Sequence, residues 1–152
     1  MNKVIKIIVS VLICQSAGFI GSLFTTPAIN TWYANILKPS FNPPSWLFAP
    51  VWTALFFLMG LALYLVWEKR AIKPMIVFFI QLFLNITWSF LFFYLHSPFY
   101  AFLEIILLWL AILATILVFS KVSKAAAFLL LPYWLWVSFA GFLNFTIWQL
   151  NP

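Results

Sequence analysis

The stretch Met75–Leu95, MIVFFIQLFLNITWSFLFFYL, decides the fold of this chain. It carries no charged residue, and it is long enough to cross a bilayer core of about 30 Å, which requires roughly 20 helical residues. Its apolar residues run on continuously instead of alternating with polar ones. This pattern favours a transmembrane helix over a strand of a transmembrane barrel.

Four further stretches of the same kind flank it, at about residues 7–24, 50–67, 99–120 and 125–148. Short polar segments separate the last four: a charged segment from Glu68 to Pro74, the tight turn His96-Ser97-Pro98 and a basic turn from Lys121 to Lys124. The sequence therefore predicts an all-α fold. It would be one integral membrane domain, residues 1–152, built as a bundle of five transmembrane helices.

The composition agrees with a chain that is embedded in a lipid bilayer. Hydrophobic residues make up 66% of it and charged residues 7%, whereas soluble domains average about 25% charged residues. This balance excludes a soluble protein and a partner such as nucleic acid. One histidine, one cysteine and two acidic residues predict no metal site, and they leave few candidates for acid–base or nucleophilic catalysis.

The basic residues predict the orientation of the bundle. Lys38 is the only one in the segments on one side, and the other side carries the remaining seven: Lys3, Lys6, Lys69, Arg70, Lys73, Lys121 and Lys124. Because basic loops stay on the cytoplasmic side, we expect the amino terminus inside and the carboxyl terminus outside.

One connection, residues 25–45, is much longer than the others and holds four prolines and several aromatic residues. Long ordered loops are often functional lids, so it could cover a cavity. Alternatively, its aromatic side chains could simply lie at headgroup depth. The pattern alone favours neither interpretation.

Polar residues inside the predicted spans mark the faces that point to the bundle interior. Gln81, Asn85 and Trp88 share a face of about 100° in the third span, where they could line a site or join helices by hydrogen bonds. Glu104, near the start of its helix, suits a structural carboxyl group. Small residues in the first span form a stripe that could pack against another span or a second protomer: Ser10, Cys14, Ala17 and Gly21.

The chain has nine tryptophans, and several lie at unusual depths. Trp88, Trp109 and Trp136 fall near the middle of their spans, where lipid offers no partner for an indole N–H. Asn85, Asn144 or a polar ligand could supply one. The indoles therefore predict either a pocket for a flat, mostly apolar molecule or a core filled by bulky side chains.

These residues together resemble the translocator protein family, also called the tryptophan-rich sensory protein or peripheral benzodiazepine receptor family. The resemblance covers most of the chain and is carried by the following motifs: Trp32-Tyr33, Leu37-Lys38-Pro39-Ser40-Phe41, Pro43-Pro44, Pro50-Val51-Trp52, Met59 to Tyr64, Gln81-Leu82, Leu84-Asn85, Trp88-Ser89, Pro132-Tyr133, Trp136, Phe139-Ala140 and Leu143-Asn144 through Trp148.

The resemblance implies a five-helix bundle, usually a homodimer, with a ligand pocket under the first loop. It implies porphyrin ligands such as protoporphyrin IX and haem, no obligatory cofactor, and a link to tetrapyrrole or stress regulation. Carried over by position, the pocket residues are Trp32, Trp52, Asn85, Trp88, Trp136 and Ala140, and Trp52 and Trp136 are the indoles tied to light-dependent porphyrin breakdown.

One departure concerns the end of the last span. Animal members place a tyrosine and then a basic residue there as a proposed cholesterol motif. Here Phe145 replaces the tyrosine and no basic residue follows Trp148, which makes cholesterol a doubtful partner. The departure favours a prokaryotic member, located in a bacterial cell membrane.

Our first hypothesis is a membrane receptor or carrier in which a porphyrin stacks on Trp52 and Trp136. Gln81 or Asn85 would offer hydrogen bonds, and Lys38 would either meet a propionate or extend its charged end to the membrane surface. The alternatives are a light-dependent enzyme that degrades protoporphyrin, and a dimeric sensor or scaffold without transport.

Overall fold

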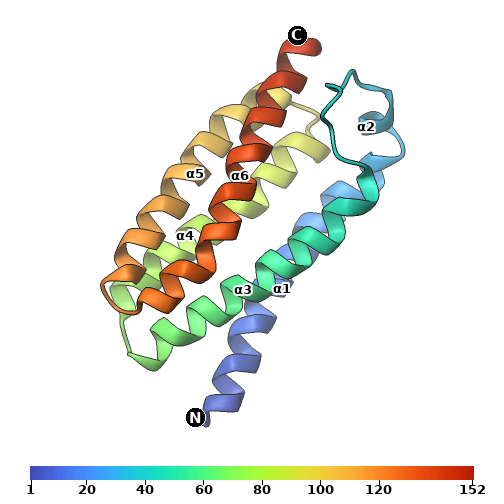
Figure 1. Ribbon diagram of the computed structural model, residues 1–152. Helices are drawn as coiled ribbons and strands as arrows, with labels where there is room; N and C mark the ends of the chain where they lie inside the picture. The colour runs from blue at the N-terminus through green and yellow to red at the C-terminus, as the bar shows by residue number, and fades with distance from the viewer.

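The computed structural model describes all 152 residues, Met1–Pro152, and contains helices but no strands (Figure 1). Five long helices, each apolar and long enough to cross a membrane, confirm the predicted all-α membrane bundle. They are α1 (Lys3–Ile29), α3 (Phe48–Glu68), α4 (Ile72–Ser89), α5 (Pro98–Ser120) and α6 (Lys124–Leu150). Three short elements complete the chain: α2 (Trp32–Asn35), the 3₁₀ turn η1 (Ser45–Leu47) and the π-helical turn η2 (Phe90–Tyr94).

The first helix is longer than the span that the sequence predicts. It starts at Lys3, where Asn2 caps it by accepting a hydrogen bond from the Val4 N–H, and it continues to Ile29. Residues 25–29 are therefore helical, although they were predicted to belong to the loop. Pro27 lies in the last turns, where its missing N–H removes only one helical hydrogen bond.

The other helices begin one to three residues before their predicted spans, and α3 and α6 also end one and two residues beyond them, because hydropathy marks the depth of the membrane and not the last hydrogen-bonded turn. The third span shows a local change of winding: α4 passes into the π turn η2 and stops before His96, which has a positive φ of 52°. Ser97 then caps α5, whose first residue is Pro98.

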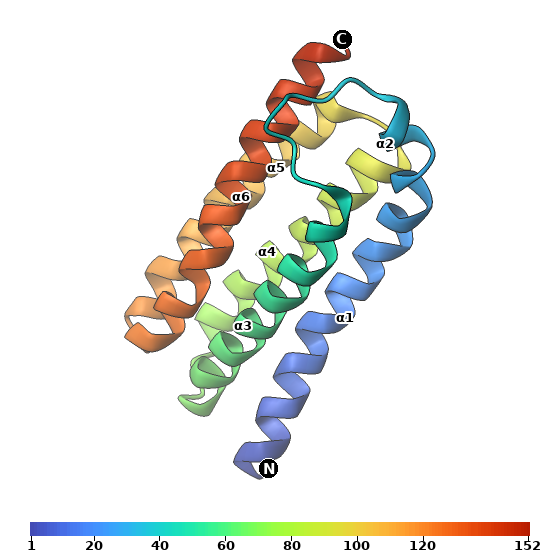
Figure 2. The same ribbon diagram turned by 45° about the vertical axis from the view of Figure 1, so that its right-hand side comes forward.

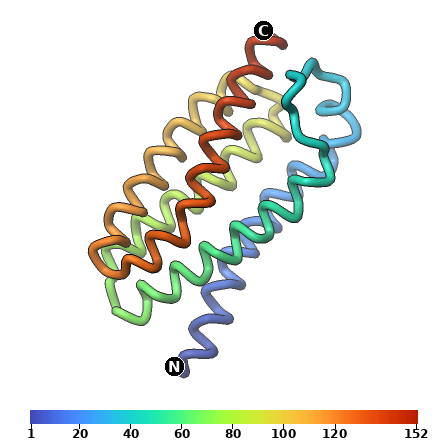
Figure 3. Tube along the Cα trace, viewed as in Figure 1, coloured from blue at the N-terminus to red at the C-terminus, as the bar shows by residue number.

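The chain path places the connections at two ends of the bundle (Figure 3). The amino terminus, the α3–α4 turn and the α5–α6 turn lie at one end, which we call the basic end because it carries the seven basic residues named above. The connection of residues 30–44 crosses the other end, beside the carboxyl terminus, and we call this the loop end (Figure 2). Within the bundle, α1 packs mainly on α3, and α5 packs on α4 and α6.

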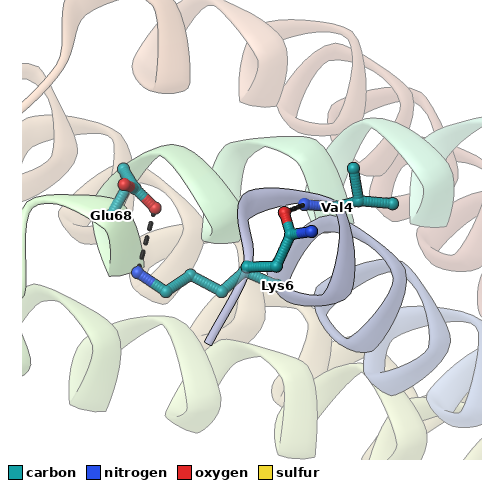
Figure 4. Close-up of polar contacts among 4 residues, drawn as sticks. Val4, Lys6 and Glu68 are labelled. Carbon is teal, nitrogen blue, oxygen red and sulfur yellow. Dashed lines mark hydrogen bonds and ion pairs between the residues drawn. The ribbon is translucent and has the colours of Figure 1, made fainter.

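One ion pair joins α1 to α3 at the basic end. The Lys6 ammonium lies 3.0 Å from a carboxylate oxygen of Glu68, the last residue of α3 (Figure 4). It is the only salt bridge in the protein, so the other basic residues at this end have no acidic partner. The basic end is therefore strongly positive.

The small-residue stripe of α1 is buried inside the protomer, where it faces α3 and α4. Ser10 and Cys14 have no exposed surface, and a Cβ atom on Gly21 would lie 3.2 Å from the Ser89 hydroxyl of α4. Of the two interpretations of the stripe, packing within the chain is the one that the structure supports.

Candidate ligand-binding cavity

A cavity of about 460 Å³ lies between α1, α3, α4 and α6, toward the loop end. This volume is within the usual range of small-molecule sites, about 300–1,000 Å³. Helix α5 contributes no wall residue, whereas the segment between α1 and α3 contributes Asn30, Tyr33 and Ser45, and η2 contributes Phe92 and Phe93. The cavity is thus a space inside the bundle that several distant segments of the chain enclose.

Along one side the cavity opens between two helices. Its wall includes exposed residues of α1, among them Phe19 and Thr26, and exposed residues of α3, among them Ala49 and Thr53. We call this opening the α1–α3 seam. Across the same seam, the Gln15 Nε2 donates to the Thr53 carbonyl at 3.0 Å.

Large aromatic side chains make up much of the wall. Trp52 of α3 packs on Phe56 and Tyr133, with ring centroids 5.7 and 6.2 Å away. Trp136 of α6 contacts the rings of Phe48 and Phe139, and Trp88 of α4 stacks on Phe92. Five of the eight binding residues predicted from the sequence lie together in this wall: Trp52, Asn85, Trp88, Trp136 and Ala140.

A chain of hydrogen bonds joins Asn85 in the wall to Gln81. The Asn85 Nδ2 donates to the Tyr133 hydroxyl at 2.9 Å, and this hydroxyl donates to the Gln81 Oε1, also at 2.9 Å. Gln81 is 1% exposed and is not a wall residue. Its amide therefore joins α4 to α6 by a hydrogen bond. Of the two roles that the sequence left open for this polar face, Gln81 takes the one of joining helices.

The indole of Trp88 finds its partner on α6. Its Nε1 donates to the Asn144 Oδ1 at 2.9 Å, and the Asn144 Nδ2 donates to the Pro98 carbonyl at 2.8 Å. These bonds connect α4, α6 and the start of α5. They fix the position of the Trp88 ring in the wall.

Trp32 and Lys38 lie outside the wall. The Trp32 ring stacks on His96 at a centroid distance of 4.6 Å. The Lys38 ammonium donates to the Tyr33 carbonyl at 2.6 Å and to the Ile36 carbonyl at 3.0 Å, and it lies 4.9 Å from the Tyr33 ring centroid. In this position Lys38 stabilises the fold of the loop.

Tyr33 anchors the same loop on the bundle. Its side chain is 3% exposed and packs on Phe93, and its hydroxyl donates to the Asn42 Oδ1 at 2.8 Å. Burial raises the pKa of the Tyr33 phenol, and the bond to Asn42 acts in the opposite direction. The phenol therefore stays protonated at neutral pH, and its hydroxyl remains a hydrogen-bond donor.

Two further contacts hold the loop across its end of the bundle. Phe41 stacks on Phe142 of α6 with ring centroids 5.3 Å apart. The Asn151 side chain accepts from the Leu37 N–H at 3.0 Å and donates to the Leu37 carbonyl at 2.9 Å. The loop aromatic residues Trp32, Tyr33 and Phe41 therefore all contact rings of the bundle, and Tyr33 is also a wall residue of the cavity.

Two of the mid-span features have no place in this cavity. Trp109 packs on Trp134, and its Nε1 donates to the Ser138 hydroxyl at 2.8 Å, on the α5–α6 side of the bundle. Glu104 of α5 is 6% exposed, and neither of its carboxyl oxygens makes a hydrogen bond. It is not a wall residue.

The contribution of α1 was missed by our reasoning from the sequence. Gln15, Ser22 and Thr26 are wall residues, as is Gly18. Their spacing of three to four residues is the signal that could have revealed a polar helical face on the first span. This face is interrupted by apolar residues, which made the small-residue stripe the more visible pattern.

These features define an integral membrane protein of five helices with an aromatic cavity that is open at one seam. The chain belongs to the TspO/MBR family, whose model matches residues 10–149. It is 48% identical to the tryptophan-rich protein TspO of Chlorobaculum tepidum, with 100% of both chains covered. It is 36% identical to the translocator protein of Bos taurus, covering 92% of this chain and 86% of the relative. The tryptophan-rich sensory protein of Cereibacter sphaeroides is 35% identical, over 86% of this chain and 85% of its own.

Proposed function

We propose that this protein is a membrane receptor or carrier that binds flat, mostly apolar ligands in the cavity, with porphyrins such as protoporphyrin IX and haem as the ligand class. The observation that carries the proposal is the cavity itself, because indole rings from three different helices border an open space of about 460 Å³. The choice of porphyrins rests on the family resemblance. The names of the relatives, translocator and sensory protein, are compatible with a carrier or a receptor.

In the proposed complex, the macrocycle stacks on Trp52 and Trp136, and Ala140 leaves room for its edge. Contacts with two indoles contribute about 1–3 kcal/mol beyond simple burial. Asn85 supplies a hydrogen bond through its Oδ1, since its Nδ2 already donates to Tyr133. Trp88, which is also a wall residue, borders the macrocycle.

Titration of protoporphyrin IX into the detergent-solubilised protein tests this proposal. We expect saturable quenching of tryptophan fluorescence, and an affinity at least tenfold lower in a Trp52→Phe, Trp136→Phe variant. A Trp109→Phe variant is the matched control, because this indole lies away from the cavity. Equal affinity in all three proteins would contradict the proposal.

Light-dependent breakdown of protoporphyrin is a second candidate function. The same two indoles favour it, because Trp52 and Trp136 both border the cavity where the macrocycle would lie. It would require light and oxygen and no acid–base residue. Product formation in light should then fall in the double Trp→Phe variant but not in Trp109→Phe. A rate equal to that of free tryptophan would end this proposal.

A homodimer acting as a sensor remains a third proposal. The stripe of Ser10, Cys14, Ala17 and Gly21 cannot form its interface, because it is buried within one protomer. A dimer would use another lipid-facing helix surface. Its mass in detergent, measured by light scattering with and without protoporphyrin, would show whether a dimer exists and whether ligand alters it.

A further inference from the structure

The cavity wall carries no ionised side chain. Its polar residues are amides and hydroxyl groups, and Tyr33, the only titratable one, has its pKa raised by burial. Lys38 is bonded to two loop carbonyls instead. Glu104 is on α5, which does not contribute to the wall.

Most donors in the wall are already bonded to the protein. The hydroxyl groups of Ser22, Thr25 and Thr53 donate to carbonyls of their own helices, at 2.6, 3.1 and 2.8 Å. Such bonds satisfy the hydroxyl proton and leave only lone pairs for a ligand. An ionised carboxylate needs donors, so these three groups offer it nothing.

The amide donors inside the cavity are committed in the same way. Gln15 donates to the Thr53 carbonyl, and Asn85 donates to the Tyr133 hydroxyl. The Trp52 Nε1, the Ser89 hydroxyl and the Trp136 Nε1 make no hydrogen bond to the protein, and of these the Trp136 Nε1 is buried. These three neutral donors belong to three different helices, and they offset only part of the cost of moving an anion out of water.

We infer that the cavity accepts uncharged ligand groups and excludes ionised ones, so that the carboxylates of a bound macrocycle stay in the α1–α3 seam at the loop end. This inference rests on the proposed ligand binding and specifies its chemistry. The exposed wall residues Thr26, Asn30 and Ser45 mark the part of the seam where water can solvate a carboxylate. Inside the bundle, an unpaired carboxylate would be strongly disfavoured.

Two small planar probes, one neutral and one anionic, test the inference without porphyrin. Pyrenemethanol and pyrene-1-carboxylate are titrated into the solubilised wild-type protein and into two variants that fill the cavity, Ala140→Trp and Ser22→Phe. Binding that either variant removes is assigned to the cavity, which corrects for probe dissolved in the micelle. We expect at least tenfold tighter cavity binding of the neutral probe. Equal affinity, a preference for the carboxylate or no cavity binding of either probe would overturn the inference.

Protoporphyrin IX and its dimethyl ester separate this inference from the proposed function. We expect the two to bind within about threefold of each other, and a Thr26→Lys variant, which adds a cation to the seam, to bind the diacid at least fivefold tighter without changing the ester. Loss of the diacid's affinity in Lys38→Met would overturn the inference. If neither porphyrin binds while pyrenemethanol does, the porphyrin proposal fails and the inference stands.

Discussion

At the scale of single residues, the tryptophans show how one side-chain type takes different roles in the same bundle. Trp88 donates to Asn144 of α6, and Trp109 donates to Ser138 of the same helix. Trp136 finds no acceptor, and Trp32 stacks on His96. An acceptor on a neighbouring residue holds the indoles of Trp88 and Trp109, whereas ring contacts hold Trp136.

We expect Trp88→Phe to destabilise the protein more than Trp109→Phe. Loss of the Trp88 indole leaves the buried Asn144 Oδ1 without its donor, at a cost of about 1–3 kcal/mol. The partner of Trp109, Ser138, is exposed and keeps its own bond to the Trp134 carbonyl, so that cost should be below about 1 kcal/mol. Thermal unfolding of both variants in the same detergent measures the difference. Similar unfolding temperatures would contradict this assignment of the two indoles.

At the scale of elements, α1 and α3 pack closely at Gly60, which lies between the cavity and the basic end. A Cβ atom on Gly60 would lie 2.6 Å from the Val11 Cα, which is a backbone atom and cannot move without shifting α1. The Lys6–Glu68 ion pair closes the basic end of the same helix pair. The two helices can therefore form a seam only toward the loop end.

Gly60→Ala should force α1 away from α3. The overlap with the Val11 backbone predicts a destabilisation of about 1–3 kcal/mol. Gly141→Ala is the matched control, because its Cβ atom would lie 3.7 Å from the Ile105 side chain, an ordinary contact. Thermal unfolding measures the loss of stability. The amount of pyrenemethanol bound in the cavity shows whether the movement of α1 alters the cavity. An unaffected Gly60→Ala protein would show that this crossing is not tightly packed.

The loop is a second element whose position depends on a few contacts. Asn151→Ala removes both hydrogen bonds to Leu37, so we expect roughly tenfold faster amide hydrogen exchange over residues 36–42. Gln149→Ala is the control, because Gln149 is exposed and makes no side-chain hydrogen bond. Unchanged exchange in Asn151→Ala would mean that the remaining contacts, such as those of Tyr33 and Phe41, hold the loop without Asn151.

At the scale of the whole molecule, the charge is divided between the two ends of the bundle. The basic end carries seven of the eight basic residues, and one of them is neutralised by Glu68. Such an excess is typical of the cytoplasmic side of a membrane protein. Because the five spans place the two termini at opposite ends, the charge predicts an external carboxyl terminus (Figure 1).

Reporter fusions in bacteria test this orientation. Alkaline phosphatase fused after Pro152 should be active, and green fluorescent protein fused at the same position should stay dark. Fusions after Ser123, in the α5–α6 turn of the basic end, should give the reverse result. An active phosphatase after Ser123 together with fluorescence after Pro152 would contradict the predicted orientation.

The sequence by itself determined the bundle. Apolar runs such as Met75–Leu95 can satisfy their backbone groups in a membrane only as helices, so the number and approximate position of the spans follow from local composition. It also predicted which face of α4 points inward, because Gln81, Asn85 and Trp88 recur with the helical period. The continuation of α1 to Ile29 could not be predicted from the sequence, because Pro27 and the threonines before it are typical of both a loop and a last helical turn.

Only the tertiary structure decided what those inward faces do. It assigned Asn144 to Trp88 and Gln81 to Tyr133, placed Trp109 against Ser138 on the far side, and brought α1 into the wall through Gln15 and Ser22. These outcomes depend on how far apart the helix axes lie. That separation is set by contacts between residues distant in the chain, such as Val11 with Gly60, and helical periodicity carries no information about it.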